Sequence, residues 1–238
     1  MGHISIVYGV IKLNDLKSFQ KTIQEMKPDE NYPWIRAEMF NTNSIECPYY
    51  YENPITTFGT TYKNLQGGSD WSEFVLKFEY LIDKIDFDFA RIRFETEFLG
   101  DFEFFWGKKT GIEPEFYKDD DLIEREKWFF GYGFRHMYGS LISENIPEHP
   151  FDFKYPIEFD EEAKNHFNTK IADLNKIQID TKKYFKDHSE ILKNDSSYLI
   201  LTYLRLNNVI EYGWEAEKGF FLKRLKKIKK INTPYETM

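Results

Sequence analysis

The sequence predicts an α+β fold in which helices cover one face of an antiparallel sheet. Runs of branched and aromatic residues alternate with segments whose apolar residues recur at helical spacing. The segment 89–98, FARIRFETEF, places apolar and charged side chains at alternate positions, as expected for a strand with one face on a core. Aromatic residues make up 18% of the 238 residues, which favours a packed core over disorder.

The elements of the N-terminal half follow from these patterns. We expect strands at residues 4–13, 32–40, 55–65, 89–98 and 102–107. Two helices are predicted between them, at residues 14–27 and 70–85. Pro28 ends the first helix, and Asp70 with Glu73 fits a capping box at the start of the second. This order of strands and helices is that of the ferredoxin-like split βαβ arrangement.

Three regions are expected along the chain. Residues 1–110 would form the ferredoxin-like α+β domain, and residues 111–158 an aromatic- and proline-rich connecting segment. Residues 159–238 show three helical patterns, so we expect a mainly helical region packed on or beside the sheet. Its last part, from Trp214, is predicted to be an amphipathic basic helix.

Composition limits the classes of function. The net charge is −8, and an acidic protein is poorly suited to general binding of nucleic acid. A single cysteine, Cys47, excludes an internal disulfide and a cysteine-based zinc site. The N-terminal segment lacks the pattern of a signal peptide, and no apolar run approaches the roughly 20 residues needed to cross a bilayer. We therefore expect a cytoplasmic protein, and no cofactor is indicated.

The first candidate site is the charged side of segment 89–98, formed by Arg91, Arg93, Glu95 and Glu97. Alternate residues of a strand point to the same face, so these side chains could form a charged ladder that reaches Arg36 and Glu38. The ladder would offer a protein partner both signs of charge in a fixed geometry. The alternative is a solvated sheet face with weak cross-strand pairs.

Two further acidic or mixed segments are candidates. The acidic run Asp119, Asp120 and Asp121 could bind a basic partner, although it could also be a solvated charge run. It lacks the spacing and the glycine of a calcium loop, so no metal site is predicted. If the protein is an enzyme acting on a nucleotide or nucleic acid, Arg135, His136 and Glu95 are the candidate residues. No catalytic motif supports that alternative, because the phosphate-binding, nucleophile-elbow and helical metal-site spacings are all missing.

The segment 218–230 contains seven basic residues and no acid, which leaves 25 basic and 40 acidic residues in the rest of the chain. Nucleic acid or a membrane surface could bind this segment through Lys223, Arg224, Lys226, Lys227, Lys229 and Lys230. The alternative is that a basic helix packs against the acidic remainder of the same chain.

In its acidic, aromatic-rich α+β composition, the chain resembles the bacterial immunity proteins that neutralise polymorphic toxins. The resemblance is carried by composition and by no motif, so no functional residues are transferred from that class. It implies a non-catalytic inhibitor whose partner is a basic toxin domain, for example a nuclease, held by acidic and aromatic residues. Attraction between opposite charges would speed the capture of such a partner.

Overall fold

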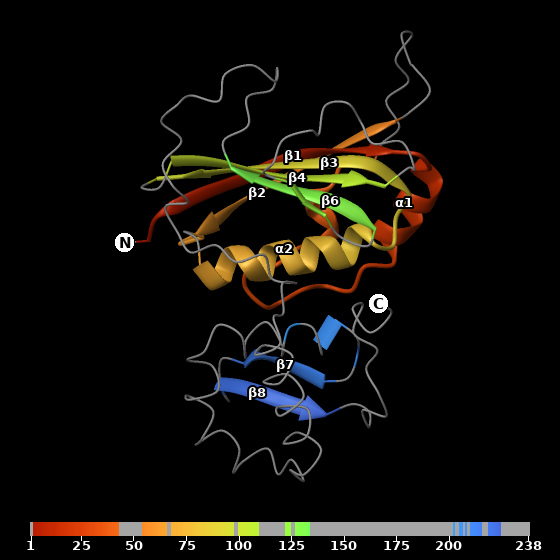
Figure 1. Cartoon of the computed structure of the whole chain (residues 1–238). Helices are drawn as coiled ribbons and strands as arrows, with labels where there is room; N and C mark the ends of the chain where they lie inside the picture. Colours follow the sequence, from red (N-terminus) through yellow and green to blue (C-terminus); the bar gives the residue numbers. More distant parts are fainter. Residues whose placement is uncertain are drawn as a thin grey trace.

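The computed structural model describes residues 2–42, 54–65, 68–97, 100–109, 122–124, 127–133, 202, 205–206, 208, 210–215 and 219–224. Its main feature is a six-stranded antiparallel sheet in the order β2-β1-β3-β4-β6-β5 (Figure 1). The strands are β1 (Ile4–Leu13), β2 (Ile55–Lys63), β3 (Phe87–Thr96), β4 (Gly100–Lys108), β5 (Leu122–Glu124) and β6 (Trp128–Gly133). Because β5 has only three residues, five strands make up the body of the sheet.

The first strand of the chain lies inside the sheet. β1 pairs antiparallel with β2 on one side and with β3 on the other, so Tyr8 lies opposite both Gly59 and Arg93. Its residues are β-branched or aromatic at most positions, which favours the extended conformation. β1 therefore fixes the position of both of its neighbours.

The two helices are α1 (Leu16–Gln24) and α2 (Gly68–Ile82), and both pack on the same face of the sheet (Figure 1). Asp15 caps α1, because its carboxylate accepts from the backbone N–H groups of Lys17 and Ser18. The structure thus confirms an α+β fold with two helices on an antiparallel sheet.

Aromatic rings fill the core between α2 and the sheet. The Phe94 ring of β3 packs edge-on against Trp71 and Phe74 of α2, with ring centroids 5.5 and 5.1 Å apart. Phe104 of β4 continues the cluster, 4.8 Å from Phe94. All four rings are fully buried, and such pairs contribute about 0.5–1.5 kcal/mol each beyond the burial of their area.

α2 is buried on all sides, which its apolar stripe did not predict. Every residue from 71 to 79 is buried, including Glu73, Lys77 and Glu79. The loop at 29–33 covers the side of α2 away from the sheet, where the Lys77 ammonium donates to the carbonyls of Asn31 and Pro33. Because the loop covers this side of the helix, the polar side chains of α2 are buried as well.

The prediction of a strand at residues 32–40 is wrong. Its only regular element is the 3₁₀-helix η1 (Ala37–Met39), followed by a single bridge between Phe40 and Phe58. Side chains satisfy the backbone here in place of a neighbouring strand, as when Asp29 accepts from the N–H of Ile35. Without this strand, the structure does not show the ferredoxin-like order, and β2 takes the place beside β1.

The region after residue 110 also differs from its prediction where it is described. β5 and β6 extend the sheet into the segment expected to be a connector. β7 (Ile210–Glu215) and β8 (Gly219–Arg224) form an antiparallel hairpin, so the basic helix predicted from Trp214 is wrong up to Arg224. Gly213 and Gly219 disfavour a helix, and the aromatic residues next to them, Tyr212, Trp214, Phe220 and Phe221, favour strands. The three helical patterns at 160–207 lie almost entirely outside the described residues.

Within the described ranges, no helix has the length and apolar character needed to cross a membrane.

Candidate functional site

The face of the sheet opposite α1 and α2 is the outer face, and it carries the predicted ladder. Alternate side chains of β1 and β3 point to it: Ile4, Ile6, Tyr8, Val10, Lys12, Phe89, Arg91, Arg93, Glu95 and Glu97. Alternation of this kind follows from the two-residue period of a strand. Arg91, Arg93 and Glu95 of β3 and Glu97 directly after it therefore lie on one face, as the sequence predicted.

Three apolar residues of β1 form an exposed apolar strip on the outer face. Ile4, Ile6 and Tyr8 are 63%, 40% and 40% exposed. Ile55 of β2 is 60% exposed on the same face, but it pairs with Lys12 at the other end of β1 and lies apart from the strip. Within the part of the chain that the structure describes, these four are all the large apolar side chains that are exposed.

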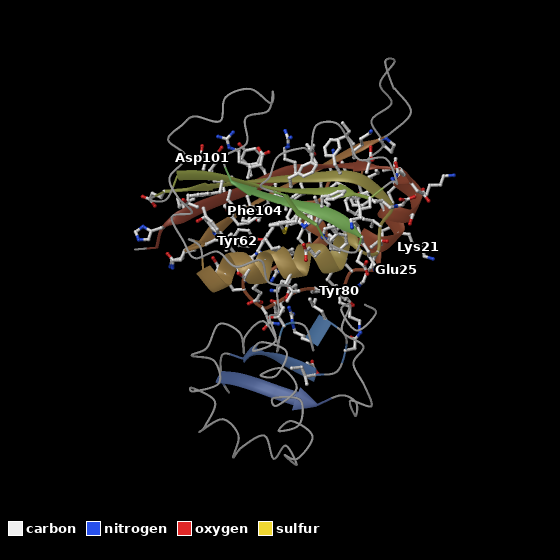
Figure 2. The ribbon with its side chains drawn as sticks, viewed as in Figure 1. Lys21, Glu25, Tyr62, Tyr80, Asp101 and Phe104 are labelled. Atoms are coloured by element: carbon white, nitrogen blue, oxygen red, sulfur yellow. The ribbon has the colours of Figure 1, made fainter. Side chains whose placement is uncertain are left out.

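The ladder lies beside the apolar strip and is internally paired. Arg93 binds Asp101 of β4 at 2.6 Å and lies 3.5 Å from Glu95. The Tyr8 hydroxyl donates to the same Glu95 carboxylate at 2.6 Å, which joins the ladder to the apolar strip. Arg91 pairs with Glu103 of β4 at 3.0 Å. Asp101 is labelled at one end of the sheet in Figure 2.

These contacts keep two residues of the face in one protonation state at neutral pH. The hydrogen bond to Glu95, followed by partial burial, raises the pKa of Tyr8 above its usual value, so its hydroxyl stays a donor. The hydrogen bond to Asp101 raises the pKa of Arg93 further from neutrality. A partner would therefore meet a neutral Tyr8 beside a charged Arg93.

Carboxylates are in excess where the ladder borders the apolar strip. Glu95, Glu97 and Asp101 gather there, against the two cations Arg93 and Lys63. The Glu97 carboxylate also accepts from the backbone N–H of Ile4 at 3.2 Å. At the other end of the face the charges match one to one, for example Lys12 with Asp88 at 2.6 Å.

A second group of charges, the buried ion cluster, lies on the side of α2 away from the sheet. Lys77 lies 3.0 Å from Glu73 and 3.1 Å from Asp29, and Arg205 binds Asp29 at 2.7 Å. Glu73 and Lys77 are almost fully buried, at 0% and 2% exposure, and Asp29 and Arg205 are 12% and 16% exposed. The cluster joins α2, the loop after α1 and the segment at 205–206.

The structure brings together only part of the predicted site. The ladder reaches Tyr8, Asp101 and Glu103 and not Arg36 and Glu38, because Arg36 lies in the loop before η1 and binds Glu30. Lys223 and Arg224 lie in β8. The other predicted site residues lie outside the described residues: Asp119, Asp120, Asp121, Arg135, His136, Lys226, Lys227, Lys229 and Lys230.

The apolar strip and the buried ion cluster were both missed by sequence reasoning. A signal for the strip existed, because segment 4–13 is apolar at both odd and even positions. A strand of that kind is either covered on both faces or has one face free for a partner. No local signal existed for the cluster, because Asp29 and Arg205 are 176 residues apart in the chain.

Neither a metal-binding group among the described residues nor a similarity to known proteins indicates the function of this site. Among the described residues, no group of three or more histidine, cysteine, aspartate or glutamate side chains could hold a metal ion. The chain matches no protein-family model, no curated protein and no solved structure.

Proposed function

We propose that this chain is a non-catalytic protein-binding protein of the immunity type, which neutralises a basic toxin domain by binding it on the outer face. The observation that supports this most is the apolar strip, which holds three of the four exposed large apolar side chains of the described residues. Apolar surface bordered by polar residues is typical of protein interaction sites.

The charges beside the apolar strip indicate the chemistry of the partner. The carboxylate excess formed by Glu95, Glu97 and Asp101 favours a partner that places lysine or arginine around an apolar contact. The net charge of −8 adds a long-range attraction for a basic domain. Both effects favour a basic protein over an acidic one.

Tyr8 is the residue we expect to contribute most to binding. Tyrosine is enriched among residues that dominate binding energy, because it combines a large apolar ring with a polar tip. Its hydrogen bond to Glu95 and its position in the central part of the sheet restrict its side chain before the partner arrives. A restricted side chain loses less entropy on binding.

The test begins with capture of the partner. The full-length chain carries an affinity tag and is used to isolate binding proteins from the cell that encodes it. The captured protein is then purified alone, and its binding is measured by calorimetry. We expect a basic domain that binds at one to one, is toxic when expressed alone, and is harmless when co-expressed with this chain.

Matched variants locate the binding face. Ile6→Lys places a cation in the apolar strip, and Gln24→Lys places the same charge on exposed α1. We expect Ile6→Lys to weaken binding at least about tenfold and to abolish protection, because it removes an apolar contact and repels a basic partner. Gln24→Lys should bind like the unmodified chain. Capture of a small molecule alone, or equal effects of both variants, would contradict the proposal.

A further inference from the structure

The segment at 205–206 contacts α2 from the side away from the sheet. Arg205 binds Asp29 at 2.7 Å through its guanidinium group, and the carbonyl of Leu206 accepts from the Tyr80 hydroxyl at 2.6 Å. Figure 2 shows Tyr80 on the side of α2 that faces away from the sheet. One polar contact thus joins this distant part of the chain to α2, and a second joins it to the loop after α1.

The charges of the buried ion cluster balance in one protonation state only. With both Asp29 and Glu73 ionised, their two negative charges cancel those of Lys77 and Arg205. When Glu73 takes up a proton, the cluster carries one positive charge in excess. Lys77 and Arg205 then share a single carboxylate, that of Asp29. An uncompensated charge in a buried position is costly.

Glu73 is the member whose charge changes near neutral pH. Burial raises its pKa to about 7, although Lys77 and Arg205 act to lower it, and Asp29 adds a smaller raising effect. Burial acts to raise the pKa of Asp29 too, but Lys77 and Arg205 together bring it below its ordinary value. Asp29 therefore stays ionised, and Glu73 gains or loses a proton within the physiological range.

We propose that the buried ion cluster links the protonation of Glu73 to the contact between Arg205 and Asp29, and so holds the segment at 205–206 on the helical side of the sheet more tightly above neutral pH than below it. The sign follows from the charges. In this proposal the loop at 29–33 stays bound to Lys77 and keeps Glu73 buried when the segment leaves. The loss of the Arg205 charge, which acts to lower the pKa of Glu73, then raises that pKa and favours proton uptake. Binding of the segment is therefore strongest where Glu73 is ionised, and it weakens as the pH falls through about 7.

Lys77 lets the contact loosen without unfolding the sheet. When Arg205 leaves and Glu73 is protonated, Lys77 still pairs with Asp29, and the remaining charges cancel again. The loop at 29–33 keeps its bonds from Lys77 in both forms. The proton thus controls the segment at 205–206 and leaves the packing of α2 on the sheet intact.

Hydrogen exchange of the full-length chain tests the contact. Amide protection of peptides covering 202–206 is compared at about pH 6 and about pH 8, after correction for the intrinsic exchange rate. We expect protection to be at least about fivefold lower at the lower pH, which is the lower end of typical coupling between sites. The amides of β1 and β3 serve as the internal reference and should keep equal protection.

Variants separate the proton linkage from the contact itself. Glu73→Gln should remove the pH dependence, and Arg205→Gln should give low protection at both pH values. Arg205→Lys keeps the charge and should retain the dependence, while Glu25→Gln, an exposed carboxylate on α1, should behave like the unmodified chain. Equal protection at both pH values in the unmodified chain, or a persistent dependence in Glu73→Gln, would overturn the proposal. If Glu73→Gln or Arg205→Gln loses the protection of β1 and β3, the comparison of the unmodified chain at the two pH values decides the proposal.

Discussion

Replacing Lys77 with methionine removes the cation that holds the loop at 29–33 against α2. The Lys77 ammonium lies 3.0 Å from Glu73 and 3.1 Å from Asp29, and it donates to the carbonyls of Asn31 and Pro33 at 2.7 and 2.8 Å. Methionine keeps much of the apolar volume and has no donor. The variant therefore leaves two carboxylates and two carbonyls without this partner.

The expected cost follows from these contacts. Removing one partner of a buried ion pair costs about 3–5 kcal/mol, because the other charge stays buried. The contacts of Lys77 share one ammonium and are not additive, so we expect a loss of about 4 kcal/mol at about pH 8. Near pH 5 the loss should be smaller, because Glu73 is then protonated and needs no cation.

Urea unfolding followed by tryptophan fluorescence measures the free energy of unfolding, since Trp71, Trp106 and Trp128 are buried around the sheet. In a thermal melt, a loss of about 4 kcal/mol corresponds to about 8–16 °C for a chain of this size. Lys21→Met is the matched control. Its ammonium is 75% exposed and 3.9 Å from Glu25, so its effect should stay within about 0.5 kcal/mol.

Two results would refute this reasoning. If Lys77→Met unfolds within about 1 kcal/mol of the unmodified chain at about pH 8, then the cluster does not hold the loop against α2. If the loss is the same near pH 5, then Glu73 does not carry the charge that Lys77 compensates.

Three further predictions concern the sheet, the core and the pH dependence of stability. Gly9→Ala should destabilise by more than about 2 kcal/mol in a thermal melt, because the added Cβ would lie 2.1 Å from the Arg91 carbonyl oxygen of β3. Gly59→Ala is the control, because its Cβ would lie 3.3 Å from the Tyr8 Cβ, and it should change stability by less than about 1 kcal/mol. If both variants lose the same free energy of unfolding, the close approach of β1 and β3 at Gly9 is contradicted. Phe94→Ala should cost about 3–5 kcal/mol in urea unfolding, and a loss below about 1 kcal/mol would exclude its central position in the core. Because the pKa of Glu73 is raised from 4.5 to about 7 on folding, its contribution should lower the free energy of unfolding by about 3 kcal/mol as the pH rises through that window. Urea titrations across this window should show that component in the unmodified chain and not in Glu73→Gln.

The regular elements could be predicted where the local pattern decides the structure. Most of segment 89–98 lies in β3, with its charged side chains on one face. Its apolar residues recur every two positions, so a strand is the conformation that buries all of them on one side. Segment 32–40 has an apolar run of similar quality, yet Asp29 and Lys77 bind the backbone groups of Ile35 and Pro33 within it. Its conformation depends on distant side chains, which a local pattern does not contain.

The same distinction applies to the candidate site. The members of the ladder on β3 follow from alternation along one strand. Their partners Tyr8 and Asp101 depend on which strands lie beside β3, and that order was predicted with a strand at 32–40 that does not form. The burial of Glu73 depends on cover from the loop at 29–33, so a helical pattern alone could not identify it.

The position of β1 between β2 and β3 has a consequence for how the chain folds during synthesis. The strand leaves the ribosome well before β3, and Tyr8 meets Glu95 only after 87 further residues have been added. Closing so long a loop precedes any gain from the contacts, which slows folding. While these residues are being synthesised, both apolar faces of β1 can contact other nascent chains. A fragment that stops before β3 should therefore aggregate or require a chaperone.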